Sequence, residues 1–188
     1  MRIILASESP FRKHALDVLG LDYQVIPSQI DEKAYPREDP VQLVTTLSRE
    51  KTLTVARGQT GAIVIGGDAV VAMNGRIYEK PRDLDEAFSM LSSLSGNTFK
   101  FITGLVVHNC DTAENQSSVR SLSIAFRPLL AHEIRDYITR YPVLKCAGAF
   151  EVDGMLRFTE HVEGCLNIGG ALPVGDLVRF LRTQGVMV

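Results

Sequence analysis

The sequence predicts an α/β protein in which helices cover a β-sheet. Strand-like and helix-like segments alternate through the first half of the chain, and residues 62–73 form the nearly continuous apolar run that is typical of a buried strand. The chain has 188 residues, of which 45% are hydrophobic, so it can form one sizeable core or two small lobes that share a sheet. We therefore expect a single domain over residues 1–188.

The first half predicts two strands and two helices ahead of the buried strand. Ser9 is a suitable N-cap with Pro10 at the first helical position, and Gly20 is a typical left-handed stop, so this helix lies between them. Pro40 opens a second helix, which carries apolar residues at helical spacing. The expected elements are a strand at 2–6, a helix from 10 to 20, a strand at 22–26 and a helix at 40–58.

The second half of the sequence contains residues that are typical of turns and of helix caps. Asn74-Gly75 predicts a tight hairpin turn after the buried strand, and Asp83 with Glu86 forms a capping box for the following helix. The expected elements are a strand at 76–79, a helix from 83 to about 94, a strand pair at 98–107 and 119–126 with a polar loop between them, and helices at about 130–140 and 173–183.

Composition excludes several classes of protein. The formal net charge of −2 gives no general basic surface, which argues against binding a nucleic acid polymer. The three cysteines are odd in number and widely spaced, so they suggest neither a disulfide framework nor a zinc site. No apolar run approaches the length that spans a bilayer. We expect a cytoplasmic protein that does not enter membranes.

The amino-terminal strand leads into a loop that is suited to phosphate. Residues 7–10 lie between the strand and the first helix, whose N-terminus offers free N–H groups and the positive end of its dipole. Arg12 and Lys13 add two full positive charges to the first turn. The alternative is a capped helix whose basic residues simply face water.

Asp68 interrupts the most apolar strand of the chain. A buried carboxylate without a partner is costly, so Asp68 is expected to meet a metal ion or a cationic side chain, unless it marks the exposed end of the strand. Gly66 and Gly67 before it allow another backbone or a ligand to come close. Lys80 closes the following hairpin, where it can hold a phosphate.

Asp31 and Glu32 follow the second strand, at the same sheet edge as residues 7–10 if the usual crossover geometry applies. Carboxylates at this edge, together with Asp68 and the nearby cations, have the composition of a site for a magnesium-bound polyphosphate. Further along, residues 146–154 and Gly169-Gly170 are small-residue segments. Either is a plain turn or a place where a flat base or an anion meets backbone, with Asp153 as a hydrogen-bond acceptor for the base.

Ten short segments, in order along almost the whole chain, resemble the Maf-type nucleoside triphosphate pyrophosphatases. They are residues 5–10 with Arg12, Asp31-Glu32, Arg49-Glu50-Lys51, Gly67-Asp68, Glu79-Lys80-Pro81, Leu94-Ser95-Gly96, Thr103-Gly104, Ala147-Gly148, Val162-Glu163-Gly164 and Gly170-Ala171-Leu172-Pro173.

The resemblance implies an elongated mixed sheet with a cleft between two lobes, a homodimer, a requirement for Mg²⁺ or Mn²⁺, and cleavage of a nucleoside triphosphate to the monophosphate and pyrophosphate. It also implies removal of noncanonical nucleotides and a link to arrest of septum formation. By position, Asp68 corresponds to the catalytic proton acceptor, and Glu32 and Asp68 to metal-binding carboxylates. The implied phosphate-binding residues are Ser7, Arg12, Lys51 and Lys80.

Three further positions follow substrate choice in this family, and here they are Phe11, Ala69 and Asp153. The dTTP and UTP branch has a basic residue, a threonine and a glutamine there, none of which is present. The branch acting on 7-methyl-GTP has an aromatic residue, a glutamine and a glutamate, together with the Cys-Ala-Gly motif found at 146–148. Phe11 and the motif favour 7-methyl-GTP, whereas Ala69 and Asp153 depart from both branches.

Three alternatives stay open. One is a pyrimidine pyrophosphatase of the same family, and another is a nucleotide-binding regulator of septum formation without catalytic activity. The third is a phosphatase acting on nucleoside monophosphates or sugar phosphates, which would release orthophosphate.

Overall fold

The computed structural model describes residues 1–164 and 172–188. Gly170-Ala171, Gly169 and Cys165 lie outside the described residues. The elements follow in the order β1 (Arg2–Leu5), α1 (Pro10–Val18), β2 (Tyr23–Val25), η1 (Glu32–Ala34), α2 (Pro40–Ala56), β3 (Ala62–Met73), β4 (Arg76–Tyr78), α3 (Leu84–Leu94), β5 (Thr98–Asn109), β6 (Asn115–Phe126), α4 (Ala131–Arg140), η2 (Val143–Lys145), η3 (Ala147–Ala149), η4 (Gly154–Arg157), β7 (Thr159–Gly164) and α5 (Val174–Thr183), where η marks a 3₁₀ turn.

Within the described residues, the strands form one seven-stranded sheet in the order β2-β1-β3-β5-β6-β7, with β4 paired to β3. Strand β1 runs parallel to both β2 and β3, whereas the β3–β4 and β6–β7 pairs are antiparallel. The sheet is therefore mixed and flanked by helices, which confirms the predicted α/β class.

The chain divides into two compact units. The first unit contains Met1–Ala69, Thr103–Arg120 and the carboxy-terminal segment with α5, and the second contains Val70–Ile102 and the chain from Ser121 through β7. Strands β3, β5 and β6 each contribute to both units. The cleft between lobes that the family resemblance implies stays a prediction.

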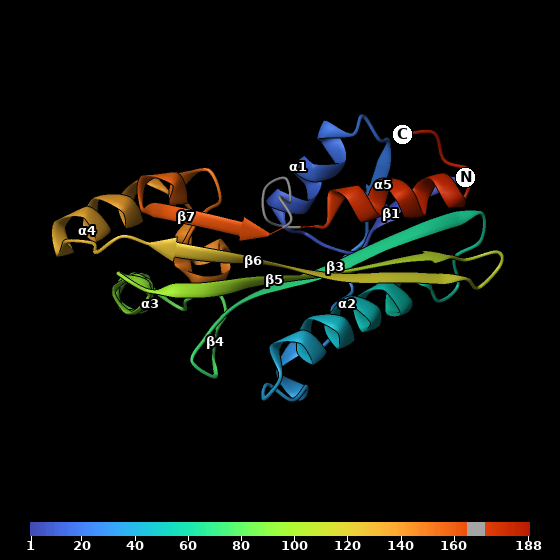
Figure 1. Cartoon of the computed structure of the whole chain (residues 1–188). Helices are drawn as coiled ribbons and strands as arrows, with labels where there is room; N and C mark the ends of the chain where they lie inside the picture. The colour runs from blue at the N-terminus through green and yellow to red at the C-terminus, as the bar shows by residue number, and fades with distance from the viewer. Residues whose placement is uncertain (165–171) are drawn as a thin grey trace. The chain divides into compact units, whose positions relative to one another are not determined.

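The core of the first unit has two layers because side chains alternate along its strands. One strand face packs against α1 and α5, and the other packs against α2, so the sheet of this unit is covered on both sides (Figure 1). Neighbouring residues of β1 show the alternation, since Leu5 belongs to the first layer and Ile4 to the second. The helices change face because β1 has β2 on one side and β3 on the other.

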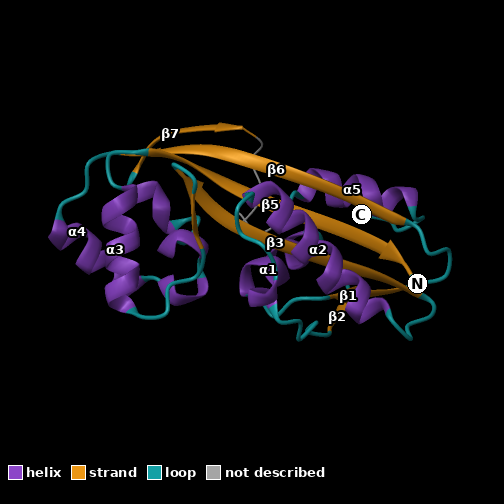
Figure 2. Ribbon diagram, turned by 90° about the horizontal axis from the view of Figure 1, so that it is seen from below, coloured by secondary structure: helices purple, strands orange, loops and turns teal. Residues whose placement is uncertain are grey.

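The second unit is built around aromatic side chains. Phe126 makes edge-on contacts with Phe99 at 4.8 Å and with Phe158 at 5.7 Å between ring centroids. Tyr137 of α4 packs on Phe158 at 4.5 Å and on Tyr141 at 4.4 Å. Helices α3 and α4 lie side by side in this unit (Figure 2).

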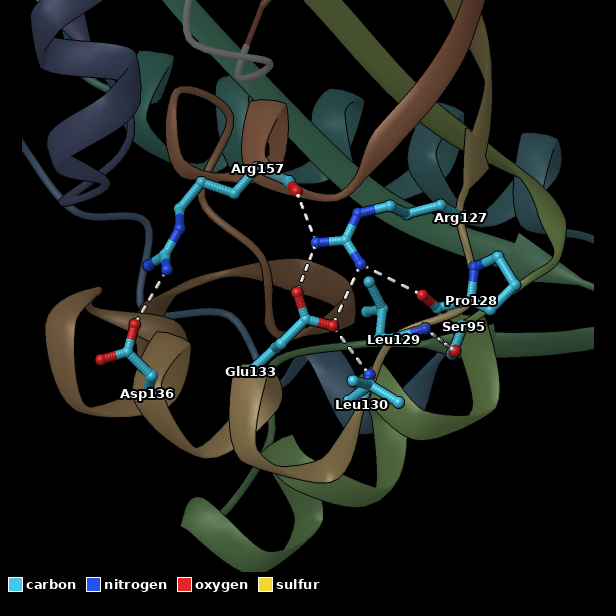
Figure 3. A network of polar contacts seen from close by, with 8 residues as sticks. All are labelled: Ser95, Arg127, Pro128, Leu129, Leu130, Glu133, Asp136 and Arg157. Atoms are coloured by element: carbon cyan, nitrogen blue, oxygen red, sulfur yellow. Dashed lines mark hydrogen bonds and ion pairs between the residues drawn. The ribbon is translucent and has the colours of Figure 1, made fainter.

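A polar network joins the start of α4 to the chain around it (Figure 3). Arg127 Nη2 and Nη1 donate to the carboxylate of Glu133, at 2.6 and 3.0 Å, and the same carboxylate accepts the backbone N–H of Leu130 at 2.9 Å. These contacts lower the pKa of Glu133 to about 2. The network places the negative carboxylate of Glu133 in the first turn of α4, where the positive end of the helix dipole stabilises it.

Several boundaries differ from the sequence prediction. Strands β5 and β6 extend into the segment that was expected to be a polar loop, so the turn between them is short. Strand β7 was not predicted, because its sequence is largely polar and lacks a clear alternation. Among the strands that the structure describes, β7 pairs with β6 and lies at the edge of the sheet, so a polar sequence is tolerated there.

Two predicted caps are also corrected. The Ser9 side chain makes no capping hydrogen bond at α1; instead the backbone N–H of Ser9 donates to the hydroxyl of Ser7 at 3.2 Å. Asp83 caps α3 by accepting the N–H of Glu86, but the Glu86 carboxylate accepts from Arg82 and so completes no box with Asp83.

None of the described helices is both long enough and apolar enough to cross a membrane. Cys110 is half-buried and Cys146 is buried, and both are free thiols.

The Glu133 network predicts an acid-sensitive contribution to stability. Because the folded-state pKa lies below the ordinary value of 4.5, the stabilisation is complete above pH 4.5 and is lost as the pH falls toward about 2. Glu133→Gln keeps the side-chain shape and loses the charge, so it should melt at a lower temperature near neutral pH and lose less of its stability between pH 4.5 and 2. Thermal unfolding across this range measures the effect, with Glu160→Gln on β7 as the matched control. Equal pH dependence in wild type and Glu133→Gln would contradict the assignment.

Candidate functional site

The candidate site lies in the first unit, where loops follow the parallel strands. Because β1 is parallel to β2 and β3, the segment with Ser7 after β1 and the segment with Glu32 after β2 leave the same edge of the sheet. This confirms the predicted common edge. Strand β1 is the point at which the strand order changes direction, and such points are where open α/β sheets bind ligands.

Ser7 and Arg12 form the first part of the site. The Ser7 hydroxyl is buried and accepts a hydrogen bond from Arg12 Nη1 at 2.9 Å, so the loop after β1 is tied to the first turn of α1. Burial lowers the pKa of Arg12 from its ordinary value, while the negative charges of Asp68 and Glu32 act to raise it. These two side chains therefore place a hydroxyl and a guanidinium together.

Asp68 and Lys51 form a buried ion pair. Lys51 Nζ lies 2.6 Å from Asp68 Oδ1, and both residues are only 6% exposed. Asp68 sits within β3, which excludes the alternative that it marks the strand's exposed end. Burial is the main cause that raises the pKa of Asp68, and the positive charges of Lys51 and Arg12 oppose the rise. The sequence prediction that Asp68 meets a cation is confirmed.

Glu32 joins the same lysine. Its Oε1 lies 2.9 Å from Lys51 Nζ, while its side chain is about half exposed. One ammonium group is thus shared by two carboxylates from different segments, η1 and β3. The formal charges of Arg12, Lys51, Glu32 and Asp68 cancel.

Gly67 gives the site its close packing on the face of α1. A Cβ placed on Gly67 would lie 2.6 Å from Leu172 Cδ2 and 2.8 Å from Gly104 O, whereas Arg12 Nε, at 3.5 Å, would be at an ordinary contact distance. The side chain of Leu172 and the backbone of β5 therefore approach β3 at a point where a side chain would separate them. The predicted role of this glycine, to allow a close approach, is consistent with this geometry.

Arg37 was not predicted, although it organises the segment that carries Glu32. Its guanidinium donates to the backbone oxygens of Tyr35 at 2.7 Å and Glu32 at 3.0 Å. Asp31 accepts the N–H of Lys33 at 3.1 Å and so starts the 3₁₀ turn. The sequence holds no signal for these hydrogen bonds of Arg37, because they are made to main-chain oxygens, which every residue offers.

The remaining predicted residues have separate positions. Phe11 on α1 and Ala69 on β3 are half-buried in the first unit. Lys80 is exposed two residues after β4, and Asp153 is exposed at the start of η4; both belong to the second unit. Their roles in binding stay predictions.

A divalent cation fits the carboxylates of this site. No group of three or more His, Cys, Asp and Glu side chains gathers around one point among the described residues. Mg²⁺, however, commonly uses one or two carboxylates and completes its shell with substrate phosphates and water. Glu32 and Asp68 already converge on one positive charge, that of Lys51, and both offer the oxygen ligands that Mg²⁺ and Mn²⁺ prefer.

Comparison with known proteins places the chain in a family. A family model described as Maf-like protein matches residues 2–184. The chain belongs to the Maf-like protein family. A dTTP/UTP pyrophosphatase of Syntrophomonas wolfei is 34% identical over 98% of this chain and 98% of its own length. A 7-methyl-GTP pyrophosphatase of Vibrio vulnificus is also 34% identical, over 100% of this chain and 97% of its own length, and a dTTP/UTP pyrophosphatase of Carboxydothermus hydrogenoformans is 36% identical over 98% and 100%. Sequence identity to these Maf-like proteins does not separate the two substrate names.

Arg37 should stiffen the Glu32 segment of this Maf-like protein. Arg37→Met removes the hydrogen bonds to the main chain, so the amides of residues 32–35 should exchange about tenfold faster, equivalent to roughly 1.4 kcal/mol of local stability. Hydrogen–deuterium exchange read by mass spectrometry measures this, with the exposed Arg57→Met as control. Unchanged exchange in residues 32–35 would show that Arg37 does not hold the segment.

Proposed function

We propose that this chain is a metal-dependent nucleoside triphosphate pyrophosphatase that hydrolyses a modified nucleotide, 7-methyl-GTP, to the monophosphate and pyrophosphate. The observation that carries the proposal is the buried carboxylate of Asp68, held 2.6 Å from Lys51, with Glu32 on the same lysine. A structural carboxylate inside an apolar strand is rare, so its burial beside cations indicates chemistry.

In the proposed reaction, Asp68 accepts a proton from the water that attacks the α-phosphorus. A new bond forms between this water oxygen and phosphorus, the bond from the α-phosphorus to the bridging oxygen breaks, and the electron pair leaves with pyrophosphate. Ser7, Arg12 and Lys51 donate hydrogen bonds to phosphate oxygens and balance the charge that develops on them. Lys80 is proposed to add a further positive charge. A divalent cation bound by Glu32 and Asp68 would neutralise the polyphosphate.

The base assignment depends on fewer residues. Phe11 offers an aromatic face to the positively charged ring of 7-methylguanine, and the proposed contact with Asp153 supplies a carboxylate for its N–H groups. Ala69 is the third proposed specificity position. The homodimer and the link to septum formation that the family resemblance implies belong to the same proposal, and light scattering tests the dimer.

A pyrimidine substrate is the second candidate. Its support is the name of the Syntrophomonas wolfei relative, dTTP/UTP pyrophosphatase, at the same 34% identity as the 7-methyl-GTP pyrophosphatase of Vibrio vulnificus. The two candidates differ only in the base, because both names describe release of pyrophosphate.

The first test is a substrate panel. Purified protein with Mg²⁺ or Mn²⁺ is incubated with 7-methyl-GTP, GTP, UTP, dTTP and CTP, and pyrophosphate and orthophosphate are measured separately. We expect pyrophosphate from 7-methyl-GTP, because only this base carries a ring charge that gains from Phe11. Turnover of the pyrimidine nucleotides alone would show that the proposed base is wrong. Orthophosphate as the first product would show that the proposed reaction is wrong, and no turnover of any nucleotide would contradict the proposal that the chain is an enzyme.

The second test concerns Asp68. Asp68→Asn keeps the size of the side chain and removes the proton acceptor, so kcat should fall by about 10²–10⁴-fold. The far-UV circular dichroism should stay that of the wild type, and Asp22→Asn, at an exposed position, is the matched control. A kcat within a factor of two of the wild type would move the proton acceptor elsewhere.

A further inference from the structure

Helix α2 lies unusually close to the sheet of the first unit, at two glycines. A Cβ placed on Gly66 of β3 would overlap Thr52 Oγ1 and come within 3.0 Å of Ser48 O. A Cβ on Gly104 of β5 would lie 2.6 Å from Ser48 Oγ and 2.7 Å from Val44 O. Figure 2, seen from the side of α2, shows the helix crossing these strands. The helix backbone therefore touches the strands where side chains normally separate them.

Two residues of α2 at this contact, Ser48 and Thr52, are polar and fully buried. Thr52 donates its hydroxyl to Ser48 O at 2.7 Å within the helix, and Ser48 Oγ has no hydrogen-bond partner. A buried hydroxyl without a partner and glycines inside strands both weaken a fold. The close contact between α2 and the strands thus lowers the stability of the fold, and its presence needs a functional explanation.

The ion pair of the site lies within a few residues of this contact on both chain segments. Lys51 follows Ser48 by three residues and precedes Thr52, and Asp68 follows Gly66 by two, so Gly66 and Asp68 face α2 from the same side of β3. Lys51 Nζ is 2.6 Å from Asp68 Oδ1 across this contact. The height of the helix above the strands therefore fixes how far the lysine reaches.

We propose that Gly66 and Gly104 are positioning residues for the catalytic pair: by having no Cβ, they let α2 approach until the Lys51 ammonium lies on the Asp68 carboxylate. The proposal rests on the proposed function for the meaning of this pair, although the packing itself does not. Neither glycine contacts the ion pair directly in this scheme. An added methyl group at either position raises the helix and lengthens the Lys51–Asp68 distance.

The test uses Gly66→Ala, its partner Thr52→Ala, and the double variant. Thr52 Oγ1 is the nearest atom to the added Cβ, and its removal leaves contacts of 3.0 and 3.1 Å that a small shift accommodates. Gly175→Ala in α5 is the matched control, because a Cβ there meets nothing within 4 Å. Circular dichroism and thermal melting establish that each variant is folded.

The first measurement needs no substrate. Reductive methylation followed by mass spectrometry gives the labelling rate of Lys51, which is slow in the wild type because the amine is buried and paired. Gly66→Ala should raise this rate at least about tenfold, and the double variant should return most of the way to the rate of Thr52→Ala alone. If Gly66→Ala does not fold, the comparison of the double variant with Thr52→Ala carries the test.

The second measurement is turnover of 7-methyl-GTP. Gly66→Ala should lower kcat by about 10²-fold with a smaller change in KM, because a misplaced reactive pair affects the transition state more than binding. The proposal would be overturned if Gly66→Ala kept the wild-type labelling rate of Lys51 and the wild-type kcat. It would also be overturned if the labelling rate of the double variant were no closer to that of Thr52→Ala than the rate of Gly66→Ala is. If the wild type hydrolyses no nucleotide, the proposed function fails while the labelling rates still decide the positioning.

Discussion

The ion pair between Asp68 and Lys51 is the interaction on which the organisation of the first unit depends. A carboxylate in the middle of an apolar strand is costly to bury, and this cost is reflected in the raised pKa of Asp68. The pair tolerates burial because Lys51 comes from a helix on the same face of the strand, at 2.6 Å. Glu32 forms a second ion pair with Lys51, and the charge of Arg12 acts on Asp68, so four charged side chains lie in one region.

Sheet topology explains why residues so far apart in sequence can meet. The order β2-β1-β3 sends the connection after β1 and the connection after β2 to opposite faces of the sheet, while parallel pairing keeps their starting loops at one edge. Arg12 thus reaches β3 over Gly67 from the α1 face, and Lys51 reaches it from the α2 face. Both positive charges act on the carboxylate of Asp68, whose pKa they lower against the effect of burial.

The site also carries features that weaken the fold. Glycines occupy the interior of β3 and β5, and the hydroxyl of Ser48 is buried without a partner. An α/β core of the same size would gain from branched apolar side chains at these positions. Proteins keep such local violations mainly where function requires them, and here they coincide with a close contact of α2 with β3 and β5 that adjoins a buried ion pair.

The α/β class, most helices and strands, and the unusual carboxylate in an apolar strand could be predicted from the amino-acid sequence, because they depend on local periodicity and on residue type. The prediction missed β7, whose polar sequence suits an edge strand, and it assigned to Ser9 a cap that the side chain does not make. The folded structure was needed to show that Asp68 meets Lys51, that Glu32 shares the same ammonium group, and that Arg37 donates to the main chain at Glu32. The physical reason is that these contacts, like the approach of α2 to Gly104, are set by how separate elements pack, which no spacing along the chain records.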